Sequence, residues 1–331
     1  MALREVNARG LPPGLLAAHV DSPRRNCDMH ALIFPHVAAK RHWLGVVSGT
    51  LLAGSMLAWS IPARADQPGL RYMHETRTRP RPLEIHVLEV NLGVEGMSIE
   101  ALVPPDPDAD GPAESSLLEP EKLAFQPDIV AAVNANAFGA IPDANGKTPE
   151  GWQVDMPVTI CGWARTGGVD MSPAEPGYGS FWIDATGCAH VGNNPGDASK
   201  DARAAVAGFG LLLGEGKVVP TVDTVLHPRT AVGTDASGSH VWLVVVDGRQ
   251  PGVSEGMTCH ELAGLMQKLG CTDAVNLDGG GSSVVMKATP SGTLEIANRP
   301  SGKGTRPVPV MLAVKHRPTA TSRRSRDRSM D

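Results

Sequence analysis

The segment 240–278 constrains the fold most, because it reads as a strand, a helix and a second strand in immediate succession. HVWLVVVD at 240–247 is an unbroken β-branched and apolar run, typical of a strand buried on both faces. Thr258 followed by Glu261 is the capping-box signature of a helix start, and DAVNLD at 273–278 enters another buried strand. A helix joining two strands favours a βαβ crossover, which would make these two strands parallel.

Strand signals dominate the rest of the chain, where apolar runs or period-two alternation alternate with turns rich in Pro, Gly and Asp. The expected strands are 83–92, 98–103, 128–136, 158–164, 180–184, 188–191, 211–213 with 218–219, and 308–315. The sequence therefore predicts an α+β or mixed α/β class: a single domain on a mixed, strand-rich sheet, with a βαβ crossover at about 240–278.

Residues 40–65 have the three parts of a signal peptide in the expected order. A short basic start precedes the uncharged run Trp43–Ile61, and Ala-Arg-Ala at 63–65 is a small-x-small cleavage site. The sequence thus predicts a periplasmic or secreted protein that begins at Asp66. The alternative is an uncleaved membrane anchor, since 19 uncharged residues are just long enough to span a bilayer.

The rest of the chain divides into an extension before this signal and, after it, a domain and a C-terminal tail. Residues 1–39 have no apolar periodicity, and Met29 suggests that the start codon is mis-assigned; a genuine disordered extension is the alternative. Residues 66–315 form the expected domain, and 316–331 read as a disordered basic tail.

Charge and spacing exclude several partners and cofactors. Residues 66–331 hold 23 basic and 32 acidic residues, whereas nucleic-acid binding needs a basic face. The two glycine-rich segments that resemble nucleotide motifs miss the required spacing, and no metal-ligand spacing of His or Cys occurs. We therefore expect no nucleic acid, cofactor or metal, and no stable membrane association after cleavage.

The cysteines suggest disulfide chemistry, as expected for an exported protein. Cys161 and Cys188 lie on neighbouring strand candidates, so the sequence predicts a bridge between them. Cys259 and Cys271 bracket the expected helix, whose rise of roughly 18 Å exceeds the Cα separation that a disulfide tolerates.

The segment NLDGGGSS at 276–283 is the strongest candidate site. A buried strand delivers Asp278 to its carboxyl end, where open α/β sheets bind ligands. Three glycines allow backbone N–H groups to approach an anion, and Ser282 adds a hydroxyl donor. The alternative is a glycine-rich turn whose carboxylate is satisfied locally.

Further polar groups follow other strand candidates. Arg229, beside Thr230, supplies a cation that can hold a phosphate bidentately. Asp247 and Arg249 end the 240–247 strand, and Asp247 is expected on the same sheet edge as Asp278. Two carboxylates with arginines suit glycoside or phosphodiester cleavage. Arg249 as a solvated turn residue is the alternative.

Several motifs together resemble the phosphodiester glycosidase family. Asn134, HPRTAVG, VVVDGR, GMT with ELA, and NLDGGGSS occur in that family's order, and the resemblance covers roughly 83–315. One departure is Asn-Ala-Asn-Ala-Phe at 134–138, where the family tends to have two glycines. The resemblance implies an exported hydrolase that cleaves a sugar-1-phosphodiester, on an envelope or exopolysaccharide glycan.

The residue roles implied are catalysis by Asp278 with Asp247, and binding of substrate or phosphate by the remaining polar groups. The binding set is Arg229, Thr230, Arg249, Asn134, Gly279, Gly280, Gly281 and Ser282. The partner is then a small-molecule or glycan substrate with a phosphodiester. The alternative function is a non-catalytic glycan-binding or envelope-assembly protein, which the altered 134–138 segment favours.

Overall fold

The computed structural model describes residues 67–317, except residues 110 and 194. The expected extension, the signal peptide and most of the basic tail lie outside these residues. Within the part that the structure describes, no helix has the length and apolar character needed to cross a membrane.

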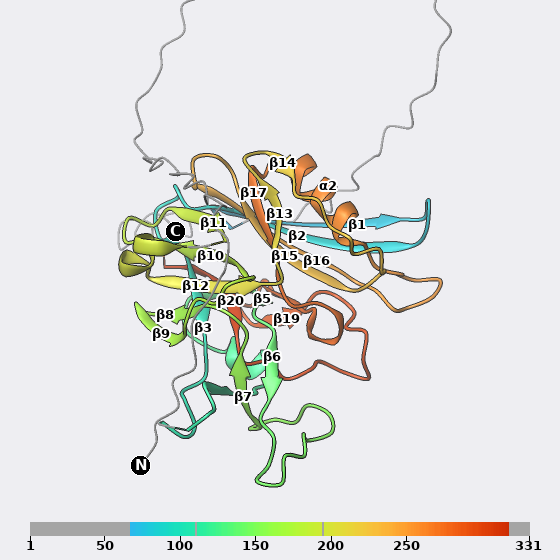
Figure 1. Cartoon of the computed structure of the whole chain (residues 1–331). Helices are drawn as coiled ribbons and strands as arrows, with labels where there is room; N and C mark the ends of the chain where they lie inside the picture. The colour runs from blue at the N-terminus through green and yellow to red at the C-terminus, as the bar shows by residue number, and fades with distance from the viewer. Residues whose placement is uncertain (1–66, 110, 194, 318–331) are drawn as a thin grey trace, which may run out of the picture.

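The largest element is a seven-stranded sheet, which we call the main sheet (Figure 1). Every neighbouring pair of strands in it is antiparallel. In spatial order its strands are β1 (Leu70–Arg77), β2 (Leu83–Asn91), β16 (His240–Val246), β15 (Arg229–Thr234), β17 (Asp273–Asn276), β13 (Leu211–Gly214) and β14 (Lys217–Val218).

The main sheet is buried on both faces, as β16 shows by strict alternation. Val241, Leu243 and Val245 face the central core, whereas Trp242, Val244 and Val246 face a second core beneath helix α2 (Cys259–Leu269). Figure 1 shows α2 lying against this outer face. Burial on both faces explains why the strand reads as an unbroken apolar run.

Three smaller antiparallel sheets complete the molecule, together with the short helix α1 (Pro120–Leu123) and the 3₁₀ segments η1 (Gly196–Asp201) and η2 (Gly280–Ser282). The central core joins the main sheet to two five-stranded sheets. One of these has the order β19 (Leu294–Ile296), β18 (Val285–Ala288), β5 (Ile129–Asn134), β20 (Met311–His316) and β3 (Met97–Leu102). The other has the order β11 (Ala189–Gly192), β10 (Gly179–Ile183), β12 (Ala204–Gly208), β8 (Ala164–Thr166) and β9 (Val169–Ser172). The three-stranded sheet has the order β4 (Ser115–Ser116), β7 (Pro157–Ile160) and β6 (Phe138–Ala140).

The predicted fold class is wrong: the protein is strand-rich with antiparallel sheets, and is not a mixed α/β fold with a βαβ crossover. The reason is β15, which lies between β16 and β17 and pairs antiparallel with both. β15 contains Arg229 and Gly233 and therefore does not look like a buried strand. Gly233 is required because a Cβ there would lie 2.8 Å from the Cys271 Sγ and the Met266 Cε.

The expected helix is confirmed with its caps. The Thr258 hydroxyl accepts a hydrogen bond from the Glu261 N–H at 3.2 Å, the Glu261 carboxylate accepts one from the Thr258 N–H, and Gly270 ends the helix in the left-handed conformation. The predicted Cys161–Cys188 disulfide is wrong, because Cys161 is a free thiol.

Candidate active site

The loop 278–283 leaves the main sheet where β17 ends and crosses to the sheet that contains β5. The Leu277 N–H still donates to the Thr230 carbonyl at 2.9 Å, but the Asp278 N–H donates to the Ala135 carbonyl, also at 2.9 Å. The chain then turns through η2. Asp278 therefore lies at the junction of two sheets, half-buried.

Asn134 and Thr230 support this loop from below. The Asn134 amide group donates to the Asp278 carbonyl at 2.7 Å. Its Oδ1 accepts from the Thr230 hydroxyl at 2.8 Å and from the Val284 N–H at 3.1 Å. Both side chains are buried, and these bonds occupy them. Asn134 and Thr230, two of the predicted binding residues, thus lie beneath the loop and hold it in place through these hydrogen bonds.

Two arginines converge on the glycines of the loop. A Cβ on Gly280 would lie 3.1 Å from both terminal nitrogens of Arg249, and a Cβ on Gly281 would overlap the guanidinium group of Arg306. Arg306 is also 3.4 Å from the Ser282 hydroxyl. Glycine at these positions therefore allows the guanidinium groups to lie directly against the backbone.

Within the described residues, neither arginine forms an ion pair. Across residues 67–317, as far as the structure describes them, no carboxylate lies within 4.0 Å of the Arg249 or Arg306 side chain. Arg249 Nη2 makes a 3.1 Å hydrogen bond to His227 Nδ1, and burial together with Arg249 lowers the pKa of His227, which keeps this imidazole neutral. Two guanidinium groups beside one loop, neither in ion-pair contact with a carboxylate, favour an anionic ligand.

The loop amides contribute less than the sequence predicts. The Gly279 N–H donates to the Asp278 carboxylate and the Gly280 N–H to the Pro228 carbonyl, at 2.9 Å for the latter. The Gly281 N–H has no acceptor among the described residues. Of the three predicted amides, only this one is available to a ligand.

Asp278 is the titratable centre of the site. Burial raises its pKa above the usual range of a carboxyl group. The hydrogen bond from Ser282, the charges of Arg306 and Arg249, and the Gly279 N–H act in the opposite direction but do not cancel this effect. A carboxyl group with a raised pKa binds a proton more readily than an ordinary aspartate, which makes it a candidate for proton transfer.

Asp247, the predicted catalytic partner, is only 3% exposed and braces another segment. Its two oxygens accept hydrogen bonds from the Asn298 side chain at 2.8 Å and from the Arg299 N–H at 2.9 Å. Asn298 in turn donates to the Ser283 carbonyl. Asp247 therefore holds the loop 278–283 in place through Asn298, and its own carboxylate is occupied by these two hydrogen bonds.

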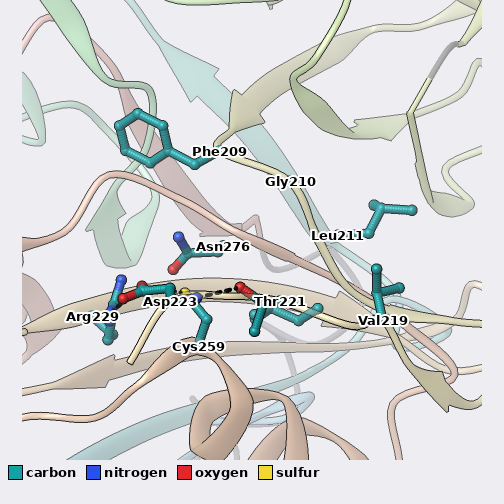
Figure 2. Close-up of a pocket in the computed structure, with 10 residues that line it drawn as sticks. Phe209, Gly210, Leu211, Val219, Thr221, Asp223, Arg229, Cys259 and Asn276 are labelled. Carbon is teal, nitrogen blue, oxygen red and sulfur yellow. Dashed lines mark hydrogen bonds and ion pairs between the residues drawn. The ribbon is translucent and has the colours of Figure 1, made fainter. Parts of the chain in front are cut away.

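Arg229 points into a neighbouring pocket, shown in Figure 2, and not toward the loop. Its guanidinium donates to the Asp223 carboxylate at 2.6 Å, to the Val225 carbonyl at 2.9 Å and to the Met257 carbonyl at 2.8 Å. The structure thus places Arg229 in an internal ion pair, and the two arginines that lie against the loop are Arg249 and Arg306.

Arg306 is the site residue that the sequence analysis missed. It follows the polar, glycine-containing stretch SGKGT and precedes Pro307, with no motif around it. Arg306 reaches the loop only because the segment between β19 and β20 passes beside it. His227 was visible as the first residue of HPRT, but only its contact with Arg249 gives it a role.

The fold and site together define a β-rich protein with a cationic, glycine-lined loop beside a titratable carboxyl group. The chain belongs to the phosphodiester glycosidase family, whose sequence profile matches residues 128–315. No curated protein sequence matches the chain.

Two solved structures share the fold. The first is the zebrafish N-acetylglucosamine-1-phosphodiester alpha-N-acetylglucosaminidase catalytic domain, auto-inhibited by its pro-peptide. It is 22% identical with a TM-score of 0.54, and the match covers 77% of this chain and 86% of that one. The second is a hypothetical protein from Synechocystis, 13% identical with a TM-score of 0.54, covering 76% of this chain and 62% of that one.

Proposed function

We propose that the protein hydrolyses sugar-1-phosphodiesters at the loop 278–283. The observation that carries this proposal is the pair of guanidinium groups, Arg249 and Arg306, which lie against Gly280 and Gly281 and form no ion pair with any carboxylate of the described residues. With the Gly281 N–H, these charged groups offer a phosphodiester several hydrogen-bond donors, whereas the Ser282 hydroxyl donates to Asp278. Membership of the phosphodiester glycosidase family supports this substrate class.

Asp278 is the base in the proposed reaction. It takes a proton from a water molecule whose oxygen forms a bond to the anomeric carbon. The bond between this carbon and the phosphate oxygen breaks, and the phosphomonoester leaves with the electron pair. Arg249 and Arg306 stabilise the negative charge that accumulates on the leaving phosphate, so a separate acid to protonate it is not needed.

The sugar is proposed by analogy alone. The zebrafish enzyme with the same fold acts on an N-acetylglucosamine-1-phosphodiester, so N-acetylglucosamine is the first sugar to test. We further propose that the natural substrate is an envelope or exopolysaccharide glycan, as the predicted export implies.

The test is to incubate the protein with the methyl phosphodiester of N-acetylglucosamine-1-phosphate in water labelled with heavy oxygen. The proposal predicts release of free sugar that carries the label, because the carbon–oxygen bond breaks. Label in the phosphate would show phosphodiesterase chemistry and contradict the proposal. Binding without turnover would favour the non-catalytic glycan-binding alternative.

A further inference from the structure

The pocket in Figure 2 adjoins the loop but differs from it in chemistry. It measures about 220 Å³ and is bounded by apolar side chains from β13 and the chain that follows, and by polar ones from β15, β17 and the start of α2. Pockets for drug-sized ligands are larger, at about 300–1,000 Å³. This volume suits one small ring.

The pocket is electrically neutral. The Asp223 carboxylate forms an ion pair with Arg229 at 2.6 Å and accepts a hydrogen bond from the Cys259 thiol at 3.0 Å. Burial raises the pKa of Cys259 to about 11, so the thiol keeps its proton and remains a donor. Because the charges compensate each other, this pocket favours a neutral polar ligand over a phosphate.

Asn276 lacks a partner at the floor of this pocket. Its side chain is 6% exposed, and its Oδ1 is a buried acceptor with no hydrogen bond. Figure 2 shows Asn276 between Phe209 and the Asp223–Arg229 pair. A buried acceptor without a donor costs free energy, so a ligand that brings a hydroxyl or amide N–H is favoured there.

Phe209 is the aromatic residue that lines the same pocket. The Phe209 side chain is 56% exposed, and its ring centroid lies 6.4 Å from that of Tyr178. Flat apolar faces next to hydrogen-bonding groups match a sugar ring, which presents C–H groups on its faces and hydroxyl groups at its edge.

The pocket and the loop are neighbours along one strand. Asn276 is the last residue of β17 and Asp278 follows two residues later at the start of the loop, so their Cα atoms are at most about 7 Å apart. We infer that this pocket holds the sugar ring of the substrate, with Asn276 accepting a hydrogen bond from it and Phe209 packing on its face. This inference rests on the proposed function for the position of the phosphate.

The experiment measures binding of free N-acetylglucosamine, glucose and inorganic phosphate by calorimetry, together with KM for the phosphodiester. Asn276→Leu keeps the size but removes the acceptor, and Phe209→Ala removes the ring. Phe125→Ala is the matched control, because Phe125 is 87% exposed and does not line the pocket.

Asn276→Leu and Phe209→Ala are each expected to weaken sugar affinity and raise KM at least about tenfold, with phosphate affinity unchanged. Asn276→Leu should not lower the melting temperature, since it removes an unsatisfied polar group. If Asn276 only stabilised the fold, the same substitution would lower the melting temperature. The inference is supported if either N-acetylglucosamine or glucose binds the wild type and binds these two variants more weakly. Unchanged sugar affinity and KM in both variants, or no sugar binding to the wild type, would overturn it.

The two proposals fail separately. If the wild type hydrolyses no phosphodiester but Asn276→Leu still removes sugar binding, the proposed function fails and the sugar pocket stands. If the phosphodiester is hydrolysed and Asn276→Leu has the KM of the wild type, the pocket assignment alone fails.

Discussion

At the scale of single residues, the site separates groups that face a ligand from groups that hold them in place. Asp278, Arg249 and Arg306 have unused hydrogen-bonding capacity at the loop. The side chains of Asn134 and Asp247 are instead occupied by hydrogen bonds to the backbone and side chains that support the loop. All the predicted residues near NLDGGGSS could be found because they are contiguous in sequence. Arg306 could not, since its place depends on tertiary structure alone.

Arg306 offers a test of the anion site. Arg306→Ala should raise KM for the phosphodiester roughly 10- to 100-fold, because it removes a hydrogen-bonding charge worth about 1.5–3 kcal/mol. Steady-state kinetics measure this. Arg317→Ala is the control, since Arg317 is an exposed arginine whose guanidinium pairs with Asp128. Equal KM values for the two variants would argue against phosphate binding by Arg306.

Asp278 also makes stability depend on pH. Burial raises its pKa in the folded protein, so its contribution to stability is present in acid and is lost as the pH rises through that pKa. Asp278→Asn removes the buried charge. At neutral pH this variant should therefore melt at a higher temperature than the wild type, with the difference vanishing below about pH 4. A variant that melts lower at pH 7 would show that the charged carboxylate stabilises the loop.

At the scale of elements, strand positions could be predicted but strand partners could not. Alternation and apolar runs mark β2, β3, β5, β16 and β20 in the sequence, and the structure has strands there. The same apolar run fits a strand buried on both faces of either a parallel or an antiparallel sheet. β15, with its arginine and glycine, was not recognised, and its insertion between β16 and β17 decides the topology.

Helix α2 depends on its capping box, which also involves Arg81 through an ion pair with Glu261. Thr258→Ala should lower the free energy of unfolding by about 1 kcal/mol, because the Glu261 N–H loses its acceptor. Thermal or denaturant unfolding measures this change. Thr258→Ser retains a hydroxyl and should restore most of the stability; if it is as unstable as the alanine variant, the hydroxyl is not the cause.

At the scale of the whole molecule, the site is assembled from segments far apart in the chain. Residues near 134, 229, 249, 278 and 306 meet because the main sheet and the sheet containing β5 pack on one core. No local sequence pattern encodes that packing, although the family resemblance gave most of the participating residues. The departure at 134–138 alters little of the brace, because Asn134 itself is retained.

Export is a prediction for the whole chain. Because Ala-Arg-Ala at 63–65 completes a signal peptide, we expect the protein expressed in a Gram-negative host to begin at Asp66. N-terminal sequencing of the material in the periplasm or medium gives the answer. A membrane-bound product that retains residues 43–61 would instead support the uncleaved anchor.

The most direct test of the account is the turnover of Asp278→Asn. The amide has the shape of the carboxylate but cannot take a proton from water, so kcat for the phosphodiester should fall by about 10²- to 10⁴-fold. The melting temperature should not fall at neutral pH, and phosphate affinity should be retained. A kcat near that of the wild type would contradict the assignment of Asp278 as the base, and with it the placement of the reaction at this loop.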